Sequence, residues 1–510
     1  MNRSPSLKER KDADPAPESE HLRTDHLLQN IGRRALSGGV VTVAAQAAKF
    51  ALNFGGVAIL ARLLTPREFG LVGMVLAITG LAGIFNKLGL STATVQRQDI
   101  THNQVSNLFW INILASGIVT IACSCLAPVV AWFYRDPRVG PIMLAMSLLF
   151  LLSGSTVQHR ALLARQMRFI PIGIIDVTST FVGFATACLL AWRGFSYWAL
   201  VAQQLSNALA GLVLTWGISK WRPSLPNRGS NVRSLATFGA HLSAADFIYL
   251  FLVNTDCILI GRLMGPVSLG LYTRASALLN RPLEQILTPV NTVMDPVLSR
   301  LQSDTEQYRR TFLRTFSLLS VLSFGFSAMC LALSRPLVLF ILGPKWESVI
   351  PLFAASAFLA ISVPAGTVVG WLYQTQGRGK DQLKSHFITG SVTFLSYLVG
   401  LFWGPLGLII AVAIATATIE LPILYYIGGR TGPVSTRDLS ITFVSKLPLW
   451  ATIYVATFAA RMAVSGSSPF IQLLVCVPTG FIAGGILLMP FPSFREDARF
   501  AFKAVMEAIT

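Results

Sequence analysis

Charged residues and reactive side-chain patterns are scarce in this chain. Only 13% of its 510 residues are Asp, Glu, Lys or Arg, whereas soluble domains contain about 25%. The six histidines form no H-x-x-H or H-E-x-x-H pattern, no phosphate-binding P-loop is present, and spacing suggests no Ser, His and Asp set. These absences argue against a soluble enzyme or a P-loop ATPase, and we expect no catalytic residues, no metal and no cofactor.

The cysteines also lack the spacing of metal ligands. All six lie within apolar runs, where a free thiol behaves as a small hydrophobe. We therefore predict no disulfide framework among Cys123, Cys125, Cys188, Cys257, Cys330 and Cys476.

The beginning of the chain has no apolar stretch, so it does not have the pattern of a signal peptide. Residues 1–32 are mostly polar and charged and include several prolines. We interpret them as a solvated, disordered cytoplasmic tail.

Long apolar runs dominate the rest of the sequence. The chain is 53% hydrophobic and its mean hydropathy is +0.60, a composition that requires lipid as solvent. Because a span needs about 20 apolar residues, the sequence predicts an all-α polytopic membrane protein with about 14 transmembrane helices. The expected spans are Leu36–Leu60, Gly70–Leu90, Leu108–Trp132, Pro141–Val157, Ile170–Trp192, Tyr197–Ile218, Leu235–Ile260, Gly270–Met294, Thr315–Leu333, Ile350–Tyr373, Phe387–Trp403, Leu406–Ile427, Phe443–Met462 and Phe470–Met489.

A short phrase occurs twice, as ARLLTPREFGLV in Ala61–Val72 and as GRLMGPVSLGLY in Gly261–Tyr272. A duplication about 200 residues apart in a membrane chain is typical of a transporter with two related lobes. The matching run in the first lobe favours a span at Gly270–Met294, although its charges and prolines also allow it to lie outside the bilayer. The motif residues that match are Arg62, Pro66 and Gly70 with Arg262, Pro266 and Gly270.

This duplication predicts two pseudo-symmetric six-helix lobes followed by two C-terminal helices. A loop rich in Pro, Gly and charge separates the lobes. The predicted organisation is a tail (1–32), an N-lobe (33–220), a linker (221–233), a C-lobe (234–430), two further spans (431–492) and a C-terminal cytoplasmic tail (493–510).

Basic residues are concentrated in alternate loops. With a cytoplasmic N-terminus, roughly 28 Lys and Arg fall on the inner side and roughly 9 on the outer side. This asymmetry places both termini in the cytoplasm, and it explains the net charge of +18 without a nucleic-acid partner. The mixed segment Gln158–Phe169 is expected to be an interfacial helix on the inner leaflet.

Polar side chains form one face of the first span. Thr42, Gln46, Lys49 and Asn53 follow a helical spacing. A lysine near the centre of a membrane costs about 2.5–3.5 kcal/mol, so it needs a wet cavity or an acidic partner. Lys49, Gln46 and Asn53 are therefore candidates for a substrate lumen, and a purely structural ion pair of Lys49 is the alternative.

Further charges lie in later spans. Arg274 and Arg281 share a face and could line the lumen, or Arg281 could pair with Glu284. The acids Asp246, Asp256 and Glu420 are candidates for proton or sodium coupling, and the first two are also candidate partners of Lys49. Two GxxxG motifs, at Gly366–Gly370 and Gly480–Gly484, predict close helix packing.

Several stretches of the chain together carry a family resemblance. They are GVVTVAAQAAKFALNFGGVAILARLLTPREFGLVGM, GLSTATVQRQDITHNQVSNLFWINI, ALLARQMRF, FGAHLSAADFIYLFLVNTDCILIGRLMGPVSLGLYTRA and LGPKWESVIPLF. These stretches resemble Wzx-like flippases of the polysaccharide transporter family, within the multidrug/oligosaccharidyl-lipid/polysaccharide exporter superfamily. The similarity covers about residues 33 to 430, and the later stretches look like the branch that exports exopolysaccharide, colanic-acid-type or teichuronic-acid-type units.

The resemblance implies transfer of an undecaprenyl-pyrophosphate-linked oligosaccharide across the bacterial inner membrane, through a cationic lumen that Lys49, Arg274 and Arg281 could supply. The expected partners are this lipid-linked sugar, the bilayer and polysaccharide polymerase and chain-length machinery. Two alternatives remain open: a multidrug or cation antiporter on the same scaffold, and a membrane-embedded polymerase or glycosyltransferase. The short outer loops argue against the enzyme.

Overall fold

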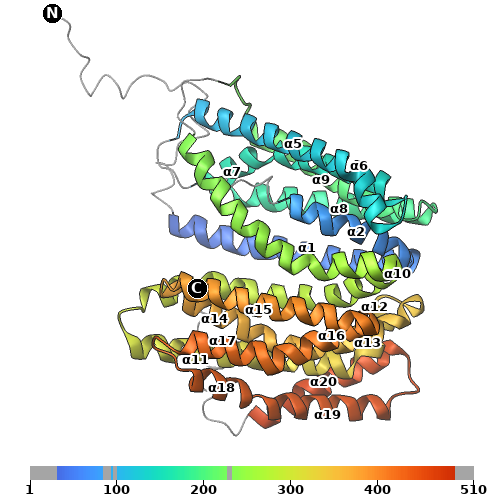
Figure 1. The fold of residues 1–510 in the computed structure, drawn as a ribbon, viewed down its shortest axis with the longest axis vertical. Helices are drawn as coiled ribbons and strands as arrows, with labels where there is room; N and C mark the ends of the chain where they lie inside the picture. Colours follow the sequence, from blue (N-terminus) through green and yellow to red (C-terminus); the bar gives the residue numbers. More distant parts are fainter. Residues whose placement is uncertain (1–30, 84–93, 96–99, 227–232, 489–510) are drawn as a thin grey trace, which may run out of the picture. The chain divides into compact units, whose positions relative to one another are not determined.

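Every element in the described part of the chain is helical (Figure 1). The computed structural model describes residues 31–83, 94–95, 100–226 and 233–488, with the side chains of this part except those of 31–40, 233–253, 286 and 488. Most of both predicted tails therefore lies outside the described residues.

The first helices of the chain are long and mostly apolar, except for one polar helix of nine residues. In order they are α1 (Ile31–Leu63), α2 (Pro66–Ala82), α5 (His102–Tyr134), α6 (Val139–Gly154), α7 (Val157–Arg165), α8 (Phe169–Trp192), α9 (Trp198–Ser219) and α10 (Arg233–Arg300).

The later part contains more short and irregular turns between its helices. They are α11 (Thr305–Ala332), α12 (Ser334–Ile341), η3 (Pro344–Val349), α13 (Ile350–Leu359), η4 (Ala360–Ser362), α14 (Val363–Thr375), α15 (Gly379–Gly400), η5 (Leu401–Trp403), α16 (Gly404–Ala415), η6 (Thr416–Glu420), α17 (Leu421–Gly429), α18 (Thr436–Val444), α19 (Leu447–Ala463) and α20 (Pro469–Leu488).

The predicted polytopic helical fold is confirmed. Nine segments of the described chain are long and apolar enough to cross a membrane, and one of them, Gly379–Gly429, contains two of the predicted spans. These two spans separate at Gly404, whose positive φ of 78° interrupts the helix. The crossing of Gly270–Met294 stays a prediction, because α10 is not one of the nine segments.

The chain divides into two compact units, Met1–Ile258 and Leu259–Thr510. In the first unit α8 packs against α1 and α9, and α6 packs against α2, α5 and α9. In the second unit α11 contacts α13, α14, α18, α19 and α20. The division falls inside α10 and not in the predicted linker at 221–233, so the lobe boundaries stay a prediction.

Helix α5 buries polar groups and exposes apolar ones. Its side chains Leu114, Ile118 and Ile121 are 59–66% exposed, whereas Asn112 and Ser116 are fully buried. Soluble helices show the opposite pattern. A lipid environment accounts for it, because hydrocarbon solvates the apolar face while polar groups are kept away from lipid, between the helices.

Small residues let helices approach closely at several points. The Gly480–Gly484 motif packs against Thr457 and Ile453 of α19, as predicted. The prediction is wrong for Gly366–Gly370, because in the described chain no atom outside the local helix lies within 4 Å of where a Cβ would stand at either glycine. Within the described part of the second unit, Gly366 is exposed, Gly370 is half-buried, and neither meets a neighbouring helix.

The repeated phrase forms the same break between helices in both places. Thr65 is extended (φ −97°, ψ 161°) before Pro66, and Gly265 is non-helical (φ 80°, ψ −178°) before Pro266. Proline disfavours a helical residue before it and has no N–H to donate, so each copy ends one helix and starts another. Burial also matches, since Gly70 and Gly270 are both buried.

We predict that Gly400→Ala destabilises the protein. A Cβ at Gly400 would lie 2.5 Å from Leu408 Cα and 2.7 Å from Gly407 O, so the α15–α16 contact must open. Such overpacking costs about 1–3 kcal/mol. The melting temperature of the purified protein should fall clearly for Gly400→Ala and stay near the parent value for Gly366→Ala, which adds a methyl group in open space. Equal melting of the two variants would contradict this packing.

Candidate functional site

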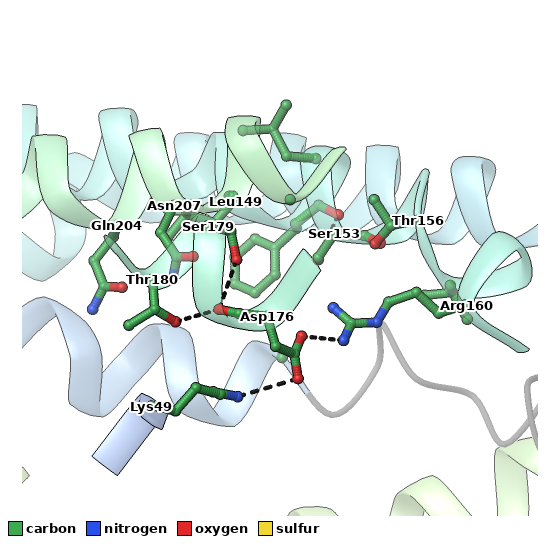
Figure 2. A pocket seen from close by; sticks show the side chains of 16 residues that line it. Lys49, Leu149, Ser153, Thr156, Arg160, Asp176, Ser179, Thr180, Gln204 and Asn207 are labelled. Atoms are coloured by element: carbon green, nitrogen blue, oxygen red, sulfur yellow. Dashed lines mark hydrogen bonds and ion pairs between the residues drawn. The ribbon is translucent and has the colours of Figure 1, made fainter. Parts of the chain in front are cut away.

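Three charged side chains from three helices meet inside the first unit (Figure 2). Lys49 lies on α1, Arg160 on α7 and Asp176 on α8. Lys49 Nζ is 3.3 Å from Asp176 Oδ2. Arg160 Nη2 donates to the other carboxylate oxygen, Asp176 Oδ1. One carboxylate thus binds two cations, each through a separate oxygen.

These groups line a cavity of about 520 Å³. Apolar side chains such as Leu149 and Phe150 form part of its wall. Figure 2 shows hydroxyl and amide side chains on other parts of the wall, which can donate hydrogen bonds to an anionic or sugar ligand. The polar residues in the wall are Ser153, Thr156, Ser179, Thr180, Gln204 and Asn207.

Local hydrogen bonds and close packing fix Asp176 in this wall. Its main-chain carbonyl accepts hydrogen bonds from Ser179 Oγ (3.2 Å) and Thr180 Oγ1 (2.7 Å). One helical turn later Gly183 faces α9, where a Cβ would lie 2.9 Å from Asn207 Cβ and 3.0 Å from Gln203 O. The glycine therefore brings α8 against α9 and closes one side of the cavity.

Buried polar contacts hold α7, which carries Arg160. Thr94 Oγ1 donates to Gln158 Oε1 (2.7 Å), and Arg165 Nη1 donates to Thr94 O (3.1 Å). The ring of His159 is fully buried. Six of the nine residues of α7 are buried in the first unit. The position of Gln158–Phe169 at the inner leaflet stays a prediction.

Aromatic rings surround His159 and fix the start of the predicted linker. The His159 ring lies 4.5 Å from the ring of Trp216 and 4.9 Å from that of Trp221, and it stacks on Phe109. Trp221 Nε1 also donates to His102 Nδ1 at 3.2 Å. The first residues after α9 are thus part of the packed first unit.

The cluster carries a surplus positive charge. Two cations and one carboxylate give a formal charge of +1, and the side chains of Lys49, Arg160 and Asp176 are 30%, 38% and 23% exposed. The sequence required a wet cavity or an acidic partner for Lys49, and the described chain places both a cavity and an acid beside it. The partner is Asp176, whereas the sequence pointed to Asp246 or Asp256.

The other candidates on α1 do not belong to the described wall of this cavity. Gln46 is exposed. Asn53 is half-buried, and its Nδ2 donates to Lys49 O at 2.7 Å, so it stabilises the helix backbone beside the lysine. A role for either side chain in a lumen stays a prediction.

The candidates on α10 lie in different environments. Arg274 is half-buried and Arg281 is exposed, and within the described chain no salt bridge joins Arg281 to Glu284. Both arginines belong to the second unit. Asp256 is half-buried and accepts a hydrogen bond from Cys257 N at 2.6 Å. The side chain of Asp246 lies outside the described residues.

Glu420 lies in a hydrogen-bond network of the second unit. It ends η6, a π-helical turn, a feature frequent at functional sites. Thr393 Oγ1 on α15 is 2.6 Å from Glu420 Oε1, and Thr416 Oγ1 is 2.8 Å from Oε2. Thr393 Oγ1 is also 2.9 Å from Thr389 O.

Sequence reasoning missed Arg160 and Asp176 as site residues. In the sequence Arg160 is only one of the charges of an inner loop, and Asp176 lies near the start of its predicted span, a position that favours the membrane interface. The available signal was the D-x-x-S-T pattern from Asp176 to Thr180, which puts an acid and two hydroxyls within one turn of an apolar helix.

The helices and the charged cavity define a multi-pass membrane protein, and comparison with known proteins gives its family. A family model described as "Polysaccharide biosynthesis protein" matches residues 59–351. Over 352 residues, 68% of this chain and 71% of the relative, the chain is 24% identical to the lipopolysaccharide biosynthesis protein WzxC of Escherichia coli K12. The chain belongs to the polysaccharide biosynthesis protein family, which confirms the resemblance to Wzx-like flippases.

Two solved structures share the fold. One is the lipid II flippase MurJ in an inward closed conformation, with a TM-score of 0.66 and 14% identity over 88% of this chain and 99% of that chain. The other is an inward-facing multidrug resistance transporter of the MATE family, with a TM-score of 0.54 and 12% identity over 79% of this chain and 94% of that chain.

We predict that water reaches this cavity. In a variant without the natural cysteines, Ser153→Cys on the cavity wall should react with a charged, water-soluble thiol reagent. Ser147→Cys is the matched control, because Ser147 lies on the same helix but is fully buried and bonded to Leu144 O. Labelling of the two cysteines at the same rate, or no labelling of Ser153→Cys, would contradict a wet cavity.

Proposed function

We propose that this protein moves undecaprenyl-pyrophosphate-linked oligosaccharide repeat units across the bacterial inner membrane for exopolysaccharide or lipopolysaccharide biosynthesis. The family, the relative WzxC and the fold shared with a lipid II flippase support this proposal. The observation that carries it is the cavity with two cations and one acid inside a bundle of apolar helices.

The chemistry of the cavity suits a phosphorylated headgroup. A pyrophosphate that crosses a low-dielectric layer loses its hydration, and charge-assisted hydrogen bonds from Arg160 and Lys49 can replace it. The neutral hydroxyls and amides of the wall, including Thr180, Gln204 and Asn207, can bond to sugar hydroxyls or phosphate oxygens. The site thus combines an anion-binding end with a polar but uncharged surface.

The depth of the cavity fits loading from the inner leaflet. Asp176 is seven positions after Phe169, the first residue of α8, which is about 10 Å along a helix. This is roughly a third of the hydrocarbon thickness. On the predicted topology α8 begins at the cytoplasmic side, so the headgroup would enter from there while the lipid tail stays in the bilayer.

Transport would then require access to alternate between the two sides of the membrane. We propose that the two lobes rock against each other, as in transporters built from structural repeats. Both termini would lie in the cytoplasm, and a polymerase with chain-length machinery would use the exported repeat unit.

The charge of the site weighs against a cation or drug antiporter. Such a transporter needs an acidic cavity for its cationic substrates, whereas the described cavity carries a formal surplus of one positive charge. The acids Asp256 and Glu420 lie outside the described wall of this cavity. A polymerase is disfavoured because the named structural neighbours are a flippase and a transporter.

We predict that Lys49→Ala strongly reduces polysaccharide export. In a strain whose own copy of the gene is deleted, the variant should export at least tenfold less surface polysaccharide, because one charge-assisted bond contributes about 1.5–3 kcal/mol. Lys384→Ala is the matched control, since Lys384 is exposed on α15. Membrane abundance of both variants is measured with an epitope tag. Full export by Lys49→Ala at normal abundance would overturn the cationic site.

We further propose that Glu420 takes up a proton during transport. The Thr393 hydroxyl has one hydrogen but two acceptors within reach, Glu420 Oε1 and Thr389 O. When Glu420 is ionised, Thr393 can donate to it. When Glu420 is protonated, its own O–H can donate to Thr393, which then donates to Thr389 O. Both protonation states therefore have satisfied partners without movement of heavy atoms.

Other titratable groups lie on the helices that contact this segment. They are His386 and Tyr397 of α15 and Tyr425 of α17. The hydroxyl partners described for the Glu420 carboxylate are Thr393 and Thr416. Asp256 and Asp246 remain candidates for sodium or proton coupling on sequence grounds alone.

The protonation of Glu420 can be observed directly. Infrared difference spectra of the purified protein between low and high pH should show the C=O stretch of protonated carboxylic acids, and Glu420→Gln should remove the component of this band that comes from Glu420. Glu347→Gln should keep it, because Glu347 is an exposed acid paired with Arg335. If the two variants give the same spectra as the parent protein, Glu420 is not the proton site.

A further inference from the structure

The Asp176 carboxylate uses both of its oxygens to bind the cations of the cavity. Oδ2 faces Lys49 Nζ at 3.3 Å, and Oδ1 accepts from Arg160. An anion that enters the cavity therefore finds both cations already paired. We propose that Asp176 is an internal counter-anion, which occupies the two cations when the cavity is empty and is displaced by the incoming pyrophosphate. This inference rests on the proposed function.

Charge explains why a pyrophosphate can displace the carboxylate. Asp176 carries one negative charge, so the empty cluster keeps a surplus of +1 that attracts an anion. A pyrophosphate group carries two or more charges and more acceptor oxygens than a carboxylate, so it can satisfy Lys49 and Arg160 better than Asp176 does. A singly charged ligand lacks this advantage, which makes the internal carboxylate a selector for multiply charged headgroups.

The same carboxylate also lowers the charge of the cavity when no substrate is bound. After release of the substrate the carrier must change its conformation again with no ligand in the cavity. Two unpaired cations inside the membrane cost free energy for two uncompensated charges. When Asp176 pairs with them, only one charge stays uncompensated, so this free-energy cost is smaller. Asp176 would therefore speed the return step at the cost of competing with the substrate.

The local structure allows this exchange with little motion. Hydrogen bonds from Ser179 and Thr180 hold the main-chain carbonyl of Asp176, so the backbone stays in place while the side chain rotates. The side chains of all three charged residues are 23–38% exposed. Rotation of such side chains is fast on the timescale of transport.

The test is binding of inorganic pyrophosphate to the full-length protein in lipid nanodiscs, measured by calorimetry. Asp176→Asn keeps the shape of the side chain but removes its charge, so the affinity should rise roughly tenfold because the competing state is lost. Lys49→Gln and Arg160→Gln should each lower the affinity at least tenfold. Asp136→Asn is the matched control, since Asp136 pairs with Arg138 outside the cavity and should leave binding unchanged.

The outcomes separate this inference from the proposed function. If Lys49→Gln weakens binding but Asp176→Asn binds equally or more weakly than the parent, Asp176 only positions the cations and the inference is wrong. If neither Lys49→Gln nor Arg160→Gln changes binding, the anion site itself fails.

A second variant covers the case in which Asp176→Asn does not fold. In Asp176→Ala, added acetate can take the vacated place between Lys49 and Arg160. Acetate should then compete with pyrophosphate in Asp176→Ala and have little effect on the parent protein. The absence of competition in the folded Asp176→Ala protein would overturn the inference.

Discussion

A charge inside a membrane protein needs a partner or water, and this constraint shapes the first unit. Lys49 is part of a helix whose neighbours are mostly apolar, and it is paired with Asp176 while bordering a cavity. Pairing alone would give a neutral structural clamp. Because Arg160 shares the same carboxylate, the cluster keeps a positive charge that only a further anion can balance.

The packing of the first unit serves to hold this cluster. Gly183 lets α8 lie against α9, and the buried contacts of Gln158 and Arg165 with Thr94 orient α7. Apolar side chains on the outer faces meet lipid, so polar groups are kept for the helix contacts and the cavity. The Glu420 network of the second unit also keeps a polar group away from lipid, since each carboxylate oxygen has a hydroxyl partner.

Much of the fold could be predicted from the sequence because membrane crossing imposes a strong length and hydropathy signal. Within the described residues the predicted spans coincide with helical structure, and the repeated Pro66 and Pro266 mark two equivalent helix breaks. Local packing was harder to predict. The two GxxxG motifs look alike in sequence, yet only Gly480–Gly484 meets a neighbouring helix.

The site was predictable only in part. Lys49 could be found because a central lysine in an apolar run is costly wherever it lies. Its partner could not be found by the same reasoning, because ion pairing depends on which helices lie side by side. Asp176 is 127 positions away in the sequence, and Arg160 belongs to a short helix whose burial comes from tertiary contacts with Thr94.

The central claim is that the cavity of the first unit holds the pyrophosphate of a lipid-linked sugar. An experimental structure of the protein with a short-chain lipid pyrophosphate bound tests it most directly. The account predicts phosphate oxygens about 3 Å from Lys49 Nζ and the Arg160 guanidinium, with the Asp176 carboxylate turned away. A headgroup bound elsewhere, with both cations still on Asp176, would contradict it.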